Sequence, residues 1–426
     1  MTTTSLFDKQ YEKRKEDLLA QVLGRISPMF AAGEVAALRI DPVDGAILSQ
    51  RSGRGFVNRD ILETLLGNLL ECVAPGSHNT LDPKYQSSLN QAIGEVADQV
   101  YAMIAQSLQA AGEEEDLEER ALISTFSLLW DLPELKERAL WNRFASLKDP
   151  AVWDAYLLHK CKLTAEELEE LAFGTHVEKA IQRRDMSAYQ AYLDELTCDY
   201  VFDYQMQLVT STYPGWRVLF YHDVAHALTR SGSVADNAQL VRQPVPLLPR
   251  AISELGGRYY QADIHPETRI GDANFLDHPH RGLTTGQTGI IGSGCHILPC
   301  TLGGLSRRLR RRHPFIGDYV FIGTDADLLG PVKIGDRSII GPHTQVYGLV
   351  ELGTDCRIGS SVVIGTVKMG QTKPGSIAIG DGVLVGDGTI LENRSEVDLT
   401  IPDRADIPAR SYVTNDGCGN PKFISQ

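Results

Sequence analysis

The chain has 426 residues, 42% of them hydrophobic, and a formal net charge of −14. This length exceeds what one hydrophobic core usually organises, so we expect two or three domains. The negative charge argues against a general nucleic-acid-binding protein, because phosphate contacts need a positively charged face. A small molecule is therefore the more natural partner.

No apolar run approaches the roughly 18 consecutive residues that a membrane-spanning helix needs. The first residues, MTTTSLFDKQYEKRKEDLL, have no apolar signal core and predict a charged helix. We therefore expect a cytoplasmic protein with no membrane partner. The seven cysteines never form a CxxC pair, which indicates neither a disulfide framework nor a zinc site.

Helical patterns dominate residues 1–200, which we predict to form an N-terminal domain for packing or assembly. No chemical motif stands out in the sequence before about residue 190. Residues 201–261 are predicted to form a helical segment that leads into the next domain. The N-terminal segments with helical spacing are NRDILETLLGNLLECV, NQAIGEVADQVYAMIAQSLQAA, ALISTFSLLWDLPELKERALWNRFASL and KLTAEELEELAF, the last with a capping box at Thr164 and Glu167.

A repeat begins after residue 260, where the sequence becomes rich in Gly and β-branched residues. A period of six suits neither an α-helix nor a long two-faced strand. It is typical of a triangular coil of three short strands, with one aliphatic side chain per side pointing inward and Gly or a small residue allowing the corner. We predict an α+β protein whose helical region precedes a left-handed parallel β-helix over 262–400, with a C-terminal tail at 401–426. The uninterrupted positions of the repeat are Ile316, Ile322, Leu328, Ile334, Ile340, Val346, Leu352, Ile358 and Ile364.

The repeat breaks between Ile297 and Ile316 at LPCTLGGLSRRLRRRHPF, whose Gly303-Gly304 pair and arginine-rich strip must leave the coil as a loop or a distorted turn. Loops on rigid scaffolds often carry function, and an arginine cluster in an acidic protein suits a ligand that bears phosphate. A solvated basic edge is the alternative. The arginines of this strip are Arg307, Arg308, Arg310, Arg311 and Arg312.

The motifs DIHPETRIGDANFLDH, TLGG and RRHP, in this order beside hexapeptide repeats, resemble the serine acetyltransferases, acetyl-CoA-dependent enzymes that open cysteine synthesis. The segments FYHDVAHALTRSG and PLLPRAISELGGRYYQADIHP resemble the helical approach to the β-helix in that family. The resemblance covers about residues 200–365. It implies transfer of the acetyl group of acetyl-CoA to the hydroxyl of L-serine.

Acetyl transfer to a hydroxyl needs a base, because a protonated alcohol is a poor nucleophile, and histidine suits this role near neutral pH. The resemblance implies that His278 is the base and that Asp263 orients it and stabilises its charge. These two residues are 15 positions apart, slightly less than one coil of three hexads, so they can meet across adjacent coils.

The other roles implied by the resemblance concern binding. Asp277 would engage the substrate ammonium and Arg312 its carboxylate. His313 would lie opposite His278 as a second polar contact, completed by a neighbouring subunit. No metal is expected. The residues that would let backbone groups approach the pantetheine arm of coenzyme A are Gly303, Gly304, Gly323 and Thr324.

Three departures from the family pattern bear on the substrate and partners. The turn DHPHRGLTTGQTG is one residue longer than usual and has Gln287 where Glu is common, which leaves the acceptor open. For the upstream aspartate that helps to bind serine, Asp194 and Asp199 are only candidates. The chain ends at Gln426, whereas docking to cysteine synthase uses a terminal isoleucine, so we do not expect that complex.

We expect a homo-oligomer, a trimer or a dimer of trimers, because β-helices of this kind present flat faces that pack around a threefold axis. Three alternatives to the main hypothesis stay open. The acceptor could be another hydroxyl compound, such as homoserine or a sugar. His278, His296 and His313 could bind zinc in a protein similar to the β-helical carbonic anhydrases. The β-helix could also be a non-catalytic trimeric scaffold.

Overall fold

The computed structural model describes residues 9–43, 59–77, 88–113, 115–147, 200–235, 237–305, 311–366 and 375–424. The chain divides into two compact units, Met1–Leu140 with Leu219–Gly256, and Trp141–Val218 with Gly257–Gln426. The predictions that lie outside the described residues are the helix KLTAEELEELAF, the candidates Asp194 and Asp199, the arginines Arg307, Arg308 and Arg310, and the terminal Gln426.

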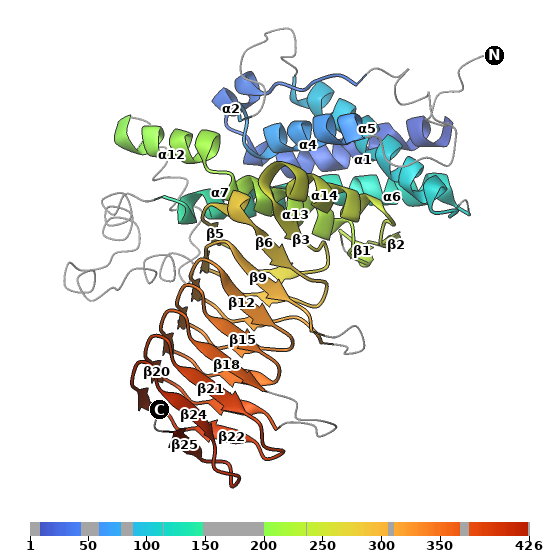
Figure 1. Cartoon of the computed structure of the whole chain (residues 1–426). Helices are drawn as coiled ribbons and strands as arrows, with labels where there is room; N and C mark the ends of the chain where they lie inside the picture. The colour runs from blue at the N-terminus through green and yellow to red at the C-terminus, as the bar shows by residue number, and fades with distance from the viewer. Residues whose placement is uncertain are drawn as a thin grey trace. The chain divides into compact units, whose positions relative to one another are not determined.

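The first unit is mainly helical, as predicted. Ser88 begins α5 by accepting a hydrogen bond from the Gln91 N–H at 3.3 Å, and Asp131 separates two helices within the segment 121–147 that we read as one pattern. Figure 1 shows α1, α4 and α5 side by side. The helices that contribute to this unit are α1 (Lys9–Ile26), η1 (Ser27–Met29), α2 (Ala32–Ala37), α4 (Arg59–Val73), α5 (Leu89–Ala110), α6 (Leu117–Trp130), α7 (Leu132–Ala145), α13 (Gly215–Ala227) and α14 (Leu248–Tyr260).

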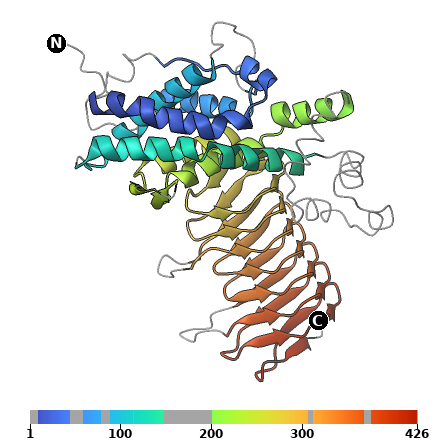
Figure 2. The ribbon, with the colours of Figure 1, turned by 180° about the vertical axis from the view of Figure 1, so that it is seen from behind.

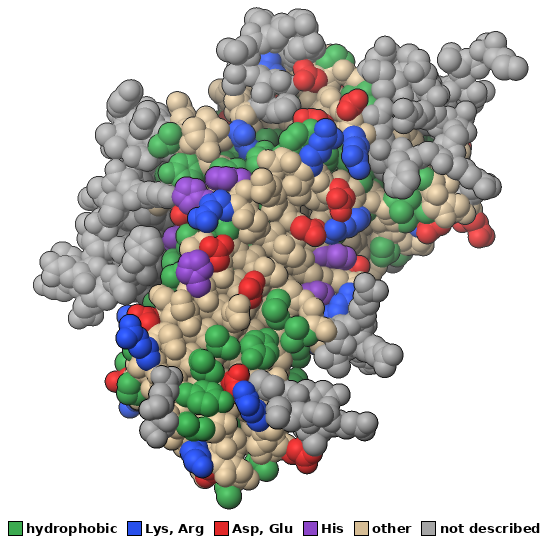
Figure 3. All heavy atoms as spheres, in the orientation of Figure 1, with side chains coloured by type: hydrophobic (Ala, Val, Ile, Leu, Met, Phe, Trp, Pro, Cys, Tyr) green, Lys and Arg blue, Asp and Glu red, His purple; other side chains and the backbone are tan. Residues whose placement is uncertain are grey.

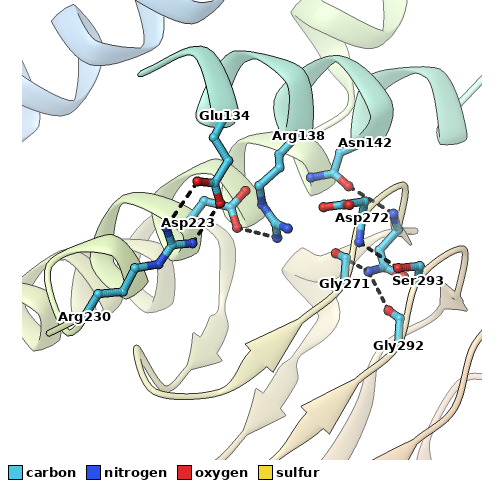
Figure 4. Close-up of polar contacts among 10 residues, drawn as sticks. Glu134, Arg138, Asn142, Asp223, Arg230, Gly271, Asp272, Gly292 and Ser293 are labelled. Carbon is cyan, nitrogen blue, oxygen red and sulfur yellow. Dashed lines mark hydrogen bonds and ion pairs between the residues drawn. The ribbon is translucent and has the colours of Figure 1, made fainter. Parts of the chain in front are cut away.

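Ion pairs join α7 to α13 and to the segment after it in this unit (Figure 4). Arg138 donates to the buried carboxylate of Asp223 at 2.8 Å, and Arg230 pairs with Glu134 at 2.9 Å. We predicted a helical segment at residues 201–261, but β1 (Gly232–Val234) and β2 (Asn237–Arg242) form an antiparallel pair within it. Within the described ranges, no helix is both long and apolar enough to cross a membrane.

The second unit contains helix α12 (Tyr200–Thr212) and the predicted parallel β-helix, drawn from yellow to red in Figure 1 and seen from behind in Figure 2. Its described strands form three sheets of seven, seven and nine strands. The first sheet has β4 (Arg269–Ile270), β7 (Ile290–Ile291), β10 (Phe315–Ile316), β13 (Lys333–Ile334), β16 (Val350–Leu352), β19 (Ile377–Ile379) and β22 (Leu399–Ile401). The second has β5 (Phe275–Leu276), β8 (His296–Ile297), β11 (Phe321–Ile322), β14 (Ile339–Ile340), β17 (Arg357–Ile358), β20 (Leu384–Val385) and β23 (Asp406–Ile407). The third has β3 (Ala262–Ile264), β6 (Leu283–Thr285), β9 (Cys300–Gly303), β12 (Ala326–Leu329), β15 (Gln345–Tyr347), β18 (Val363–Thr366), β21 (Ile390–Asn393), β24 (Tyr412–Asn415) and β25 (Pro421–Ile424).

The hexapeptide pattern accounts for the core of the β-helix. The nine aliphatic positions from Ile316 to Ile364 are each at most 2% exposed, and the small or β-branched residues four places on, from Val320 to Val362, are fully buried. Phe315 pairs with Lys333 and Phe321 with Ile339, so paired positions are three hexads apart and three hexads complete one coil. The predicted fold class is confirmed.

Glycine is required at some corners because the next coil packs directly against it. Gly317 and Gly323 directly follow an inward aliphatic residue, and the next coil passes so close that a Cβ at Gly323 would lie 2.6 Å from the Pro342 nitrogen. The left-handed conformation at the corners is adopted by Gly294, Gly382 and Gly388 but also by larger residues, among them Tyr319 (φ 59°) and Arg337 (φ 58°). Their N–H groups donate to carbonyls of the preceding coil, which stabilises the conformation.

The β-helix extends beyond residue 400, where we expected a tail. Strands β22, β23 and β24 continue the three sheets, and β25 pairs antiparallel with β24. The inward residues of these strands, Ile401, Ile407 and Val413, are at most 2% exposed. The hexad signal is weaker here because the paired positions Ala378 and Thr400 are further apart than three hexads.

Candidate active site

His278 lies at an irregular corner of the first coil, directly after β5. Its backbone is left-handed (φ 52°, ψ 44°), and a short 3-10 turn, η3 (Pro279–Arg281), follows it. This coil is longer than a regular one, since the spacing from Arg269 to its partner Ile290 exceeds three hexads. The extra length lets the His278 side chain project, and it is 56% exposed. An exposed imidazole on a rigid scaffold is accessible to a substrate.

Asp277 is the carboxylate paired with this imidazole in the structure. Its Oδ1 lies 3.4 Å from His278 Nε2, and its Oδ2 lies 3.6 Å from His296 Nε2. The Asp277 N–H donates to the Ile297 carbonyl at 2.9 Å, which anchors the residue to the next coil. The Asp277 side chain is only 12% exposed. A buried carboxylate beside an exposed imidazole suits recognition of a cationic group.

Asp263 lies on β3, where its Cα is the register partner of Thr284 in β6. Its side chain is exposed. The predicted orientation of His278 by Asp263 is not tested by this arrangement and stays a prediction.

The RRHP segment is anchored by Thr288. The Thr288 hydroxyl oxygen accepts hydrogen bonds from the backbone N–H groups of Arg312 (3.1 Å) and His313 (3.2 Å). It also lies 2.9 Å from His313 Nδ1. The Arg312 guanidinium donates to Gln287 Oε1 at 2.9 Å, and Gln287 in turn donates to Glu267 at 3.0 Å. The turn that is longer than usual in this sequence therefore positions both predicted binding residues of the loop.

His313 is held as a neutral hydrogen-bond donor. The Thr288 N–H donates to His313 Nδ1 at 3.3 Å, so that nitrogen carries no proton and Nε2 carries it. Burial, then the charge of Arg312, then His265, lower the pKa of His313. The lowered pKa favours the neutral form of the imidazole.

The glycines of the TLGG motif are brought next to this histidine. The His313 ring lies between Gly286 and Gly304: a side chain at Gly286 would overlap the ring, and a Cβ at Gly304 would lie 3.0 Å from Nε2. The prediction that Gly303 leaves the coil is wrong, because Gly303 ends β9 and pairs with Leu329 of β12. A Cβ at Gly303 would lie 2.9 Å from the Leu329 side chain. The structure thus brings Arg312, His313 and Gly304 together.

Gly323 and Thr324 lie one coil further along. Among the described residues, the Thr324 hydroxyl oxygen is buried and has no hydrogen-bond partner. Such a hydroxyl is suited to bind a polar ligand group. The structure therefore groups Asp277 with His278, and Arg312 and Gly304 with His313. Within the described part of this single chain, no hydrogen bond or ion pair joins His278 to His313.

Sequence reasoning missed a residue outside the coil, Asn142, that supports the segment just before His278. The Asn274 N–H donates to Asn142 of α7 at 3.0 Å, and the Asn274 side chain bonds to Gly271, Gly292 and Cys295. Asn274 precedes His278 by four positions. Asn142 carries no motif, so no signal in the sequence could have found this contact.

Gly215, at the start of α13, makes a second contact of this kind. A side chain there would overlap the Leu276 carbonyl, directly before Asp277. The same turn places the Tyr213 ring 6.5 Å from that of Phe275. The YPG sequence could have indicated a turn at Gly215, but it gives no indication that Gly215 contacts Leu276. Thr288 and Gly286 were visible within TTGQTG, but nothing linked them to His313 before the fold was known.

The cysteines of this region are buried. Burial raises the pKa of the Cys295 thiol to about 12 and also raises that of Cys300, so neither is a ready nucleophile. In the ranges covered by the structure, no group of three or more His, Cys, Asp or Glu side chains is arranged to hold a metal ion.

Comparisons with known proteins agree with the geometry. Residues 313–348 match the bacterial transferase hexapeptide (six repeats) family. The chain is 34% identical over 147 residues to serine acetyltransferase of Synechococcus elongatus, covering 34% of this chain and 54% of that protein. It is 35% identical over 165 residues to the Mycobacterium tuberculosis protein of the same name, covering 38% and 63%.

The match to serine acetyltransferase of Staphylococcus aureus is more complete. It has 33% identity over 179 residues, which is 42% of this chain and 71% of that protein. The chain spans between half and two thirds of the Synechococcus and Mycobacterium relatives. Because this relative is 33% identical and 71% of its length is matched, the chain belongs to the serine acetyltransferase family.

Proposed function

We propose that this protein transfers the acetyl group of acetyl-CoA to the hydroxyl of L-serine, yielding O-acetylserine and free coenzyme A for cysteine synthesis. The observation that carries the proposal is the pair at the first corner, an exposed His278 imidazole 3.4 Å from the buried Asp277 carboxylate. The family relationship supports the same reaction.

In the proposed reaction, His278 takes the proton of the serine hydroxyl as the oxygen attacks the acetyl carbonyl carbon. The tetrahedral intermediate collapses, the carbon–sulfur bond breaks, and the imidazolium returns its proton to the coenzyme A thiolate. Asp263 orients the imidazole and stabilises its charge. General-base catalysis of this kind contributes roughly 10² to 10⁴ in rate.

The remaining residues serve binding. Asp277 pairs with the serine ammonium and Arg312 with its carboxylate, through charge-assisted hydrogen bonds. His313 offers its Nε2–H to an oxygen of the reacting groups. Gly303, Gly304, Gly323 and Thr324 form the path for the pantetheine arm, and the buried Thr324 hydroxyl supports this assignment. No metal takes part in the proposed steps.

We further propose that His278 and His313 meet between neighbouring subunits of a trimer or a dimer of trimers in the cytoplasm. Apolar side chains on the outer faces of the β-helix support assembly: Ile339, Leu384 and Ile390 are each at least 36% exposed. Figure 3 shows hydrophobic side chains gathered over the lower coils. Light scattering tests this, since a fully active 46.8 kDa monomer would contradict it.

The test of function is thiol release from acetyl-CoA by the purified full chain, measured against serine, homoserine and a panel of sugars. We expect serine to give the highest kcat/KM. A higher value for homoserine or a sugar would reassign the acceptor while keeping the reaction. The absence of thiol release with every acceptor, together with no coenzyme A binding by calorimetry, would favour the scaffold alternative.

A further inference from the structure

A third imidazole, that of His296, lies at the candidate site and has no role in the reaction proposed above. His296 points outward from β8, between Phe275 on the preceding coil and Phe321 on the following one. Its ring centroid is 4.7 Å from that of Phe275 and 5.1 Å from that of Phe321. Two aromatic rings thus hold the imidazole in one orientation.

This orientation directs His296 Nε2 at Asp277. The distance from Nε2 to Asp277 Oδ2 is 3.6 Å, while the other carboxylate oxygen lies 3.4 Å from His278 Nε2. The Asp277 N–H also donates to the carbonyl of Ile297, which directly follows His296. One carboxylate therefore lies between two imidazoles, at distances that can shorten when a substrate binds.

The fold itself does not require an imidazole at this position. The same outward column of the second sheet continues from Phe321 to Ile339, Arg357 and Leu384, so apolar and cationic side chains are equally compatible with it. A carboxylate on a corner can rotate about its side-chain torsions, and those rotations move its oxygens away from a bound cation. The position of His296 suits a residue that limits this rotation.

We propose that His296 is a positioning residue for Asp277 and thereby sets the affinity for an acceptor that carries an ammonium group. Its Nε2–H holds Oδ2, so that Oδ1 stays on the His278 side, where the ammonium binds. This inference rests on the proposed function, because it assigns the ammonium of serine to Asp277. His296 acts on the substrate indirectly, by holding the Asp277 carboxylate.

The test compares two substitutions that separate the N–H from the ring. His296→Phe keeps the aromatic packing with Phe275 and Phe321 but removes the donor. His296→Gln gives up the ring but places an amide N–H near the position of Nε2. We expect His296→Phe to raise the KM for serine about tenfold, as the loss of a charge-assisted contact does, while kcat and the KM for acetyl-CoA change less than about threefold. In His296→Gln the KM for serine should return to within about threefold of the wild type.

Arg357→Gln is the matched control, since Arg357 occupies the same outward column further along the β-helix. It should leave both KM values unchanged. A wild-type KM for serine in His296→Phe would overturn the inference, because the histidine would then only fill space between the rings. Equal impairment of both His296 variants with a lowered melting temperature would also overturn it, since packing would be the cause.

The wild-type enzyme, measured in parallel, distinguishes the two proposals. If the wild type releases no thiol in the presence of serine, the proposed function is refuted, and the inference falls with it. If the wild type is active and the variants are unchanged, only the inference is refuted.

Discussion

The regular coils of the β-helix and its first coils share one architecture but differ in the spacing between paired positions. Between Phe315 and Val363, paired positions repeat every three hexads, and corner N–H groups bond to the coil before. In the first coils the spacing is longer than three hexads, from Phe275 to His296 and, by a wider margin, from His296 to Phe321. The candidate site residues His278, Arg312 and His313 all lie in these longer connections.

This difference has a physical basis. A regular coil is completed by its neighbours, so the backbone groups of its strands are paired and its outward side chains vary freely. Extra residues at a corner cannot join the ladders, and they project side chains while the rest of the coil stays fixed. The regular coils therefore provide stiffness, and the irregular ones provide the candidate chemistry. Mutations in the two regions should have separable effects.

The strongest loss of activity is expected at the irregular corner itself. His278→Ala should lower kcat by about 10²- to 10⁴-fold without unfolding the protein, because it removes the proposed base from an exposed position. Arg410→Ala is the control, since Arg410 has a similar left-handed backbone (φ 61°) at a corner of a later coil, away from the candidate site. Steady-state kinetics and circular dichroism measure both variants. An active His278→Ala enzyme would end the proposed mechanism.

A core substitution in a regular coil should have the opposite signature. Ile340 on β14 is fully buried, and Ile340→Ala should lower the free energy of unfolding by about 2–5 kcal/mol through lost burial and the cavity left behind. The kcat of the remaining folded enzyme should be unchanged. Denaturant titration and kinetics on the same sample check this. A selective loss of kcat would show that stiffness and chemistry are not separable.

Gly286→Ala tests the close packing around His313. The added methyl group would overlap the imidazole, and a displacement of about 1 Å at a reacting group can cost about 10² in rate. Gly257→Ala, in α14, is the control, because a Cβ there meets no atom within 4 Å. We expect a reduced kcat/KM in the first variant alone. Equal activity of the two would remove His313 from the mechanism.

Arginines in the two regions offer a comparison of binding roles. Arg312→Ala should raise the KM for serine by about tenfold or more, since a charge-assisted contact contributes about 1.5–3 kcal/mol, and leave that for acetyl-CoA unchanged. Arg337, bonded to Asp355 at 2.8 Å on a regular coil, is the matched position, and Arg337→Ala should alter neither constant. If Arg312→Ala behaves like Arg337→Ala, the substrate carboxylate binds elsewhere.

The weakest effect concerns pH. Because the pKa of His313 is lowered in the folded protein, the unfolded chain takes up a proton more readily once the pH falls below about 6.5. The wild type should then lose unfolding free energy relative to His313→Gln, by no more than about 1.4 kcal/mol per pH unit for one proton. Chemical denaturation from pH 8 to pH 5 measures the difference. A difference that does not change over this range would mean that His313 is not buried in its neutral form.

The β-helix and the family could both be predicted from the sequence. One aliphatic residue in six is a local pattern that specifies an inward side chain on every side of a coil, so the burial of the positions from Ile316 to Ile364 followed from counting alone. The motifs around His278 and His313 were recognisable because they are contiguous. The helices α4 and α5 were likewise predictable from their spacing, because each forms its own hydrogen bonds.

The contacts between distant side chains could not be predicted in this way. Asn142 reaches Asn274 across 132 residues, and Thr288 anchors His313 across 25. Asp277 lies against His296 because the coil between β5 and β8 is longer than three hexads and still brings these two strands into register. The six-residue repeat does not predict that length. Contacts of this kind depend on the stacking of one coil on another and on side chains that come from distant parts of the chain. They exist only in the folded chain, because the residues involved have no local preference for one another.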